Sequence, residues 1–140
     1  MTAMAGYSTT PLVRKLGFKE NSRAALVGAP AGFAGTLGEL PEGVRFVAPS
    51  RAPLDLVVLF VRGSPELERE FAKLAPRLAP AGMLWVAWPK RSSGVATDLT
   101  ENVVRDTGLA LGLVDTKVCA IDETWSGLRF VIRLNDRPRV

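Results

Sequence analysis

Two uninterrupted apolar runs lie in the middle of the chain, over residues 56–61 and 83–88. Neither run alternates between apolar and polar residues, so both faces of each segment are expected to be buried, as in the interior of a parallel sheet. Between the runs, apolar residues recur at helical spacing and form one packing stripe: Leu67, Phe71, Leu74 and Leu78. Residues 55–90 therefore predict a strand, a helix and a second strand in sequence.

The ends of the predicted helix carry residues typical of helix termini. Ser64 is expected to cap its start, with Pro65 in the first helical position and Glu66 near the positive end of the helix dipole. Pro76 has no backbone N–H to donate, so the last turn is expected to kink or loosen there. Residues 80–82, Pro-Ala-Gly, then separate the helix from the second strand.

The first third of the chain predicts short elements separated by glycine and proline. A helix is expected over 10–17, with Thr10 as its cap, Pro11 in its first position and Gly17 at its end. The remaining elements follow in order: a strand over 24–27, a turn over 28–32, a brief helix over 33–37 and a strand over 44–47.

A further helix is predicted in the last third of the chain, after a flexible polar loop over 91–94. Asp98 and Glu101 have the capping-box spacing, which starts a helix that runs to about Leu111 and stops at Gly112. Gly108 within it is expected to weaken the helix by about 1 kcal/mol relative to alanine.

Two segments of alternating residues, 114–120 and 128–134, close the chain. The turn-prone residues 122–127 join them, which predicts an antiparallel hairpin at the edge of the sheet. On this pattern Lys117 and Cys119 share the wetter face of the first strand.

Together these elements predict an α/β fold. We expect a three-layer sandwich around a mostly parallel, Rossmann-like sheet of about six strands, ending in the C-terminal antiparallel hairpin. Since no internal repeat or linker divides the sequence, a single domain is expected over 1–140, with residues 1–6 flexible.

Composition narrows the chemistry. The 140-residue chain contains no histidine and one cysteine, Cys119, so it lacks an internal disulfide, the commonest general base and the commonest zinc ligand, and no metal site is predicted. Its net charge is +4, but 18 basic residues are scattered among 14 acidic ones, which indicates a solvated surface rather than a nucleic-acid interface. No apolar run is long enough to cross a bilayer, so a cytoplasmic location without membrane contact is expected.

Several segments resemble the core of a class I, S-adenosylmethionine-dependent methyltransferase. These are Leu16-Gly17, the strand up to Gly28, Asp55 at the start of an apolar strand, residues 78–84 before the next strand, and the closing hairpin. The resemblance covers most of 10–134. It implies a truncated core, because too few residues separate the second strand from Asp55 to hold the third strand and helix of that family.

The departures from that family are concentrated at its cofactor motifs. Such enzymes usually carry an acidic residue and a glycine-rich turn after the first strand, and a second acidic residue at the end of the second strand. Here neither Leu26 nor Val27 is acidic, and the cation Arg51 follows the second strand. The resemblance therefore implies a degenerate core for which no cofactor is predicted, with S-adenosylmethionine left open as an alternative.

Shorter motifs resemble a family of small bacterial proteins of unknown function, which implies no reaction. These motifs are Gly6-Tyr7-Ser8, residues 84–90, residues 97–100 and residues 122–127.

The candidate site is the rim formed by the carboxyl ends of the parallel strands, where ligands gather in open α/β sheets. The rim is expected to carry two turn glycines, four cations, two indole rings and two carboxylates: Gly28, Gly32, Arg51, Arg62, Trp88, Lys90, Arg91, Asp122, Glu123 and Trp125. The cations, with helix starts after Ser64 and Thr97, suit a phosphate or a carboxylate ligand.

Each candidate also has a structural interpretation. The cations are better explained as solvated loop residues or as partners of Asp122 and Glu123, and those two carboxylates are expected to form a turn and salt bridges rather than to supply a general base. Trp88 and Trp125 form either an aromatic wall for a ligand or part of the core. Cys119 is expected to pack rather than react, and the Trp88–Pro89 bond is a candidate for the cis form.

Three functions are compatible with these sequence features. The first is a non-catalytic binding or regulatory module with an anionic or nucleotide-like ligand at the rim. The second is an enzyme that uses S-adenosylmethionine or a nucleotide through unusual loops. The third is a scaffold that pairs through the C-terminal hairpin, either with itself as a homodimer or with another protein, with residues 128–134 at an exposed sheet edge.

Overall fold

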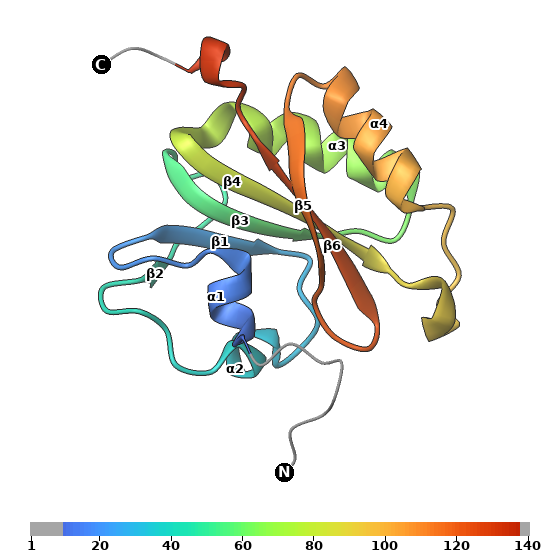
Figure 1. Cartoon of the computed structure of the whole chain (residues 1–140), viewed down its shortest axis with the longest axis horizontal. Helices are drawn as coiled ribbons and strands as arrows, with labels where there is room; N and C mark the ends of the chain where they lie inside the picture. The colour runs from blue at the N-terminus through green and yellow to red at the C-terminus, as the bar shows by residue number, and fades with distance from the viewer. Residues whose placement is uncertain (1–9, 138–140) are drawn as a thin grey trace.

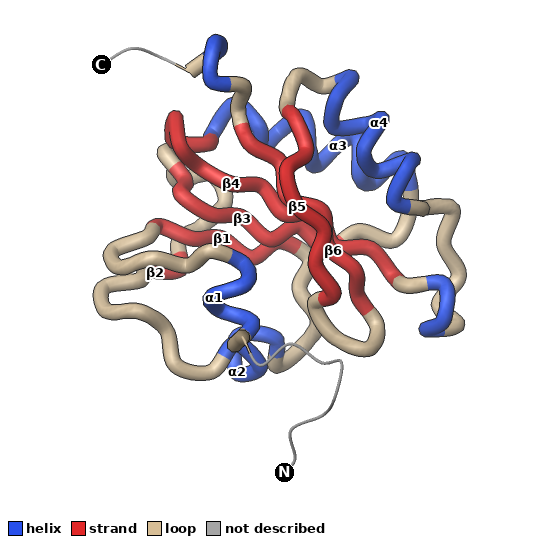
Figure 2. Tube along the Cα trace, viewed as in Figure 1, coloured by secondary structure: helices blue, strands red, loops and turns tan. Residues whose placement is uncertain are grey.

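The computed structural model describes residues 10–137, and in this part of the chain six strands form one sheet in the order β2-β1-β3-β4-β6-β5 (Figure 1). The strands are β1 (Arg23–Val27), β2 (Arg45–Phe46), β3 (Leu54–Phe60), β4 (Leu78–Pro89), β5 (Val114–Ala120) and β6 (Trp125–Val131). The helices are α1 (Leu12–Leu16), α2 (Phe33–Leu37), α3 (Ser64–Leu74) and α4 (Glu101–Ala110), with 3-10 turns η1 (Ala75–Arg77), η2 (Arg91–Ser93) and η3 (Leu134–Asp136) (Figure 2). The expected flexibility of residues 1–6 and the Gly6-Tyr7-Ser8 motif lie outside the described residues.

The two apolar runs pair in parallel at the centre of the sheet, as predicted. β3 and β4 are in register from Leu56 opposite Met83 to Phe60 opposite Ala87, and β1 pairs with the other side of β3 in the same direction. Every residue of β3 except Asp55 is buried, because helices cover both faces. The unbroken apolar pattern thus reports burial on two sides.

The sheet is the middle layer of three. α1 and α2 cover one face, where Leu16, Phe33 and Leu37 join a core with Leu56, Val58 and Phe60 (Figure 1). α3 and α4 cover the other face, where a second core gathers residues from both helices and from β3, β4 and β6: Val57, Leu59, Leu67, Phe71, Leu74, Val86, Val104, Leu128 and Phe130. The predicted three-layer α/β sandwich is confirmed.

The edge next to β2 is short, as the truncated resemblance implies. β2 contains two residues, and within 10–137 no helix or further strand lies between it and β3. In the same described range, no helix is both long and apolar enough to cross a membrane.

The residues that cap the starts of α3 and α4 differ from those predicted. α3 has Gly63 rather than Ser64 as its N-cap residue, and the Ser64 backbone N–H donates to the Asp98 carboxylate at 3.0 Å. Asp98 therefore does not start α4. Thr100 does, because its hydroxyl accepts from the Val103 N–H at 3.2 Å. The sequence spacing pointed to residues that do cap helices, but Asp98 caps α3, which begins 34 positions earlier in the chain, and not α4.

Other boundaries follow from particular residues. α1 begins at Leu12, with Pro11 in the N-cap position, and ends at Gly17 in the left-handed conformation. The last turn before β4 is 3-10 helix at Pro76, in agreement with the loosened turn expected there. β4 begins at Leu78, earlier than predicted, because residues 80–82 form an irregularity within the strand rather than a turn before it.

The hairpin is antiparallel as predicted, but β6 lies inside the sheet and β5 forms its edge. β6 starts at Trp125 because Gly127 is strand rather than turn: a Cβ there would lie 3.0 Å from Ile121 and 3.2 Å from Trp85. The prediction that residues 128–134 lie at an exposed edge is therefore wrong, since β6 pairs with β4 on one side and β5 on the other.

Cys119 faces the core rather than the wetter face. It is 6% exposed, whereas Val118 beside it is 49% exposed. The register of β5 against β6 shifts between Asp115 and Lys117, and this irregularity breaks the simple alternation on which the prediction rested.

Candidate ligand-binding site

The rim holds the predicted residues except Arg51, but the structure divides them among separate environments. Gly28 and Gly32 follow β1, Arg62 follows β3, and Lys90 and Arg91 follow β4. Asp122 and Glu123 lie in the turn between β5 and β6, and Trp125 begins β6. Arg51 is not on the rim: the chain runs back from β2 to the start of β3, which places Arg51 beside Arg23 at the amino-terminal edge of the sheet.

The turn at 28–32 packs against β3 and forms hydrogen bonds with the start of α2. A Cβ on Gly28 would lie 2.7 Å from the Phe60 carbonyl oxygen, so this glycine lets β1 approach β3. The Pro30 carbonyl accepts from the Phe33 N–H, and the Gly32 carbonyl accepts from the Thr36 N–H, each at 3.1 Å. These bonds start α2, which makes the turn a connection between strand and helix.

Aromatic rings fill the space above β1 and β3. Phe60 makes edge-on contacts with Phe33, at 4.8 Å between ring centroids, and with Trp125, at 5.0 Å. All three rings are nearly fully buried. The guanidinium of Arg62 lies over the Trp125 ring, 5.0 Å from its centroid, and so covers this aromatic row from solvent.

Trp88 and Trp125 do not form one wall. Trp88 packs in the core under α3 and α4, and Trp125 packs in the core under α1 and α2, on the opposite face of the sheet. The core interpretation of both residues holds. The Trp88–Pro89 bond is trans, and the cis bond among residues 10–137 is Ala52–Pro53.

The predicted site residues Asp122 and Arg51 make hydrogen bonds that hold the fold together. One Asp122 carboxylate oxygen accepts from the N–H groups of Thr124 and Trp125, both at 2.8 Å, which fixes the hairpin turn. Glu123 is exposed beside it. The Arg51 carbonyl accepts from the Arg23 guanidinium at 2.8 Å, at the start of β1, so the exposed Arg51 lies at the opposite edge of the sheet from Arg91.

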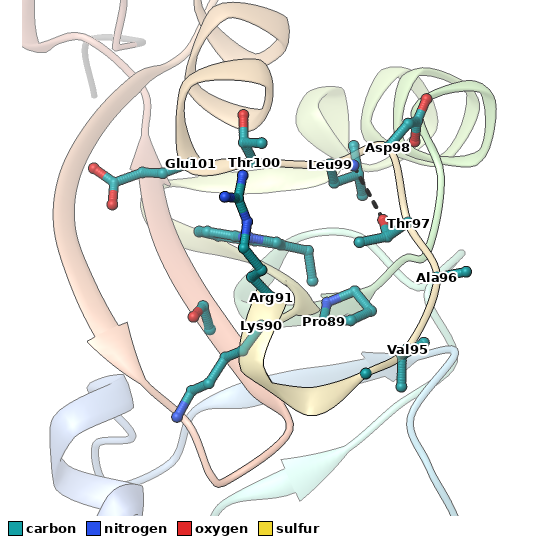
Figure 3. Close-up of a pocket in the computed structure, with 13 residues that line it drawn as sticks. Pro89, Lys90, Arg91, Val95, Ala96, Thr97, Asp98, Leu99, Thr100 and Glu101 are labelled. Carbon is teal, nitrogen blue, oxygen red and sulfur yellow. Dashed lines mark hydrogen bonds between the residues drawn. The ribbon is translucent and has the colours of Figure 1, made fainter.

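A cleft of about 550 Å³ lies between the end of β4 and the start of α4 (Figure 3). We call it the β4–α4 cleft, and its lining is Trp88, Pro89, Lys90, Arg91, Gly94, Val95, Ala96, Thr97, Asp98, Leu99, Thr100, Glu101 and Ser126. Buried Trp88 and Leu99 supply apolar surface. Three predicted site residues, Trp88, Lys90 and Arg91, thus share one hollow.

Arg91 crosses this cleft. Its side chain extends from η2 toward Thr100 at the start of α4 (Figure 3). Within 10–137, no ion pair involves Arg91. Its positive charge therefore faces a helix start, where the backbone N–H groups also favour an anion.

The carboxylates at the cleft are already engaged. Asp98 accepts from the Ser64 N–H, and hydrogen bonding to Ser64 lowers the pKa of Asp98. Glu101 pairs with Arg105 at 2.6 Å, and Arg105 also donates to Asp115 at 2.8 Å. Hydrogen bonds to Asp115 and then to Glu101 raise the pKa of Arg105. Neither cleft carboxylate forms an ion pair with Arg91.

Lys90 points the other way. Figure 3 shows its side chain directed away from Arg91, and its backbone N–H donates to the Thr124 carbonyl at 2.7 Å. The predicted rim of four cations is therefore not one site, since Arg51, Arg62, Lys90 and Arg91 face four different surroundings.

The sequence missed the loop residues that complete the cleft. The Thr97 hydroxyl donates to the Arg62 carbonyl at 2.6 Å and accepts from the Leu99 N–H at 3.1 Å, which fixes the loop across the rim. A Thr two residues before a buried leucine is the local signal for this turn. Among residues 10–137, no cluster of three histidine, cysteine or acidic residues is placed to hold a metal ion.

Comparisons with known proteins bear on the fold. No protein-family model matches the chain, and no curated protein sequence matches it, so the resemblance to a small bacterial family stays a prediction. A solved TehB-like SAM-dependent methyltransferase from Corynebacterium glutamicum is 12% identical, with a TM-score of 0.55 over 92% of this chain and 91% of that one. A precorrin-6y C5,15-methyltransferase from Geobacter metallireducens is 12% identical, with a TM-score of 0.60 over 86% of this chain and 85% of that one.

The fold has a methyltransferase-like Rossmann core. A third solved structure, Aeropyrum pernix fibrillarin with natively bound S-adenosyl-L-methionine, is 16% identical and has a TM-score of 0.54 over 90% of this chain and 70% of that one. At such identities the likeness extends to the fold alone.

The residues of this methyltransferase-like core do not fit S-adenosylmethionine at the position that the resemblance implies. The first turn is closed by its own hydrogen bonds, and no acidic residue follows β1 or β2. The buried rings of Phe33, Phe60 and Trp125 fill the adjacent space. We therefore derive no step through this cofactor.

Proposed function

We propose that this methyltransferase-like domain is a non-catalytic binding module that takes a small anion in the β4–α4 cleft. The observation that carries the proposal is Arg91, which extends across the cleft to the start of α4 while both cleft carboxylates bind other groups of the protein. An anion there meets a guanidinium that forms no competing ion pair within 10–137.

The apolar part of the cleft narrows the ligand class. Trp88 and Leu99 line the same hollow as Arg91, and its volume of about 550 Å³ suits a molecule larger than a bare ion. A phosphate or carboxylate attached to an apolar or ring-shaped body matches this lining. A guanidinium binds such groups through two parallel hydrogen bonds.

Calorimetry with inorganic phosphate and with phenyl phosphate tests the proposal. We expect both to bind, phenyl phosphate more tightly, and Arg91→Ala to weaken binding at least tenfold. Arg69→Ala is the matched control, because Arg69 is an exposed arginine on α3, remote from the cleft, and should bind as the unchanged protein does. Equal binding by Arg91→Ala and the unchanged protein, or no heat from either probe, contradicts the proposal.

A methyltransferase-like enzyme is the second candidate, because one similar fold is described with natively bound S-adenosyl-L-methionine. Calorimetry with S-adenosylmethionine separates the two functions. On our proposal no heat of binding is expected at micromolar protein, since the turn after β1 is closed by its own hydrogen bonds and no acidic residue directly follows β1 or β2. Saturable heat that survives Arg91→Ala would favour the enzyme.

A further inference from the structure

A second hollow lies on the opposite side of the hairpin from the β4–α4 cleft, between α1 and the edge strand β5. Its volume is about 420 Å³, and we call it the α1–β5 groove; its lining is Thr10, Arg14, Lys15, Lys117, Val118, Cys119 and Ala120. Three of these seven residues are cations and none is acidic. The groove is separate from the cleft, with which it shares no lining residue.

Lys15 is fixed at this groove by the main chain of β5. Its ammonium group donates to the Ala120 carbonyl oxygen at 3.4 Å. An ammonium group has three N–H donors, so two remain for a ligand. The contact places a positive charge at the end of the edge strand and joins α1 to the hairpin.

Two lysines from different elements line the groove, Lys15 of α1 and Lys117 of β5. Lys117 lies two residues before Cys119, which also lines the groove. The side chain of Lys90, between β4 and η2, is directed away from Arg91 (Figure 3). The charges of Lys15, Lys117 and Lys90 all lower the pKa of the Cys119 thiol, although burial raises it more.

These charges form no ion pair with an acidic residue in the described part of the chain. None of the four ion pairs among residues 10–137 includes Arg14, Lys15, Lys90 or Lys117. Like charges held this close repel one another, and a bound anion of matching charge removes that repulsion. The groove therefore favours a ligand with more than one negative charge.

We propose that the α1–β5 groove binds a small phosphorylated molecule through Arg14, Lys15 and Lys117. Tetrahedral phosphate oxygens accept from several ammonium groups at once, and the groove is large enough for a diphosphate. Single-stranded nucleic acid is a poorer match, because no aromatic ring lines the groove for base stacking.

Cys119 provides a built-in reporter. It is the single cysteine of the chain and lines the groove. Because it is only 6% exposed, iodoacetamide reaches it through transient local opening at the groove, and this slow alkylation can be followed without competition from another thiol. Pyrophosphate in the groove shields the thiol and neutralises the lysines that lower its pKa, and both effects slow alkylation. We expect a slowing of about fivefold at saturation, matched by saturable heat in calorimetry.

Charge variants locate the binding. Lys117→Gln and Arg14→Gln should each weaken pyrophosphate binding at least fivefold and reduce its protection of Cys119. Lys73→Gln, on α3 and paired with Glu70, is the control and should leave both readouts unchanged. Circular dichroism of each variant verifies that it is folded, so that a lost signal reports the groove.

One further comparison distinguishes binding at the α1–β5 groove from binding at the β4–α4 cleft. Arg91→Ala should abolish binding in the cleft while pyrophosphate still protects Cys119. The groove proposal is overturned if sodium chloride at equal ionic strength protects Cys119 as well as pyrophosphate does. It is also overturned if Lys117→Gln and Arg14→Gln retain full protection, or if protection depends on Arg91.

Discussion

The ring of Phe130 on β6 lies against Gly108 on α4, in the space that a β-carbon at position 108 would need. Phe130 also packs edge-on against Phe71 of α3, with ring centroids 5.1 Å apart. Gly108 was predicted to weaken α4, since glycine is a poor helix former. Its absent side chain instead lets α4 approach the sheet, so packing outweighs propensity here.

Gly108→Ala should therefore destabilise the protein although alanine favours helix. The helical gain is about 1 kcal/mol, whereas forcing a methyl group into this packed contact costs about 1–3 kcal/mol. We expect a net loss of up to about 2 kcal/mol by urea denaturation. Gly35→Ala is the control: it lies in α2 with open space around the added atom, and should gain about 0.4–1 kcal/mol. Equal effects of the two substitutions would remove the packing argument.

Trp85 fastens α1 to the sheet. Its indole N–H donates to the Leu16 carbonyl at 2.7 Å, and both residues are fully buried. Trp85→Phe leaves that carbonyl without its donor, which costs about 1–3 kcal/mol beyond the lost volume. Trp88→Phe removes the same side-chain volume from another buried strand position, so it serves as the reference for the cost of lost volume alone. We expect thermal denaturation to show the larger loss for Trp85→Phe, and a smaller loss there would contradict the assignment.

Asp98 should give the fold a pH dependence in acid. Hydrogen bonding to Ser64 lowers its pKa in the folded chain, so the carboxylate stabilises the fold above its unfolded pKa of about 3.9. That contribution is lost as pH falls through the lower folded-state pKa. Asp98→Asn should thus lower the melting temperature by a few degrees at pH 7 and by progressively less below pH about 4.

The matching control for Asp98 is Asp106→Asn, an exposed aspartate on α4 that is not a cap of α3. It should leave the melting temperature nearly unchanged at both pH values. A difference between Asp98→Asn and the unchanged protein that persists in strong acid would show that the charge is not responsible.

Arg62 is expected to protect the aromatic row rather than to bind ligand. Removing its guanidinium in Arg62→Ala exposes the Trp125 ring and should cost about 0.5–1 kcal/mol, with a red shift of tryptophan fluorescence. Arg51→Ala, which removes an exposed arginine at the opposite edge of the sheet, should change neither quantity. If phenyl phosphate binding falls in Arg62→Ala as much as in Arg91→Ala, Arg62 belongs to the site after all.

Local patterns predicted most of the fold. The unbroken runs around Val58 and Val86 and the stripe from Leu67 to Leu74 record burial that neighbouring residues share, so they identified β3, β4 and α3. The hairpin was found from alternation, yet its place was wrong. A pattern of one strand does not record which strand lies beside it.

The candidate site was harder to predict because its contacts join distant residues. Asp98 caps a helix that begins 34 positions earlier, and no spacing rule reaches so far. Lys90 and Arg91 are adjacent, yet their side chains point in opposite directions, and Arg91 is the one that crosses the β4–α4 cleft. Sequence reasoning found the cations but joined them into a single rim.

The row of Phe33, Phe60 and Trp125 has a consequence for how the protein behaves without a ligand. These three buried rings pack against one another, so the core beside the rim is filled by side chains and needs no bound molecule to complete it. The packed core therefore does not require the anions that we propose for the β4–α4 cleft and the α1–β5 groove.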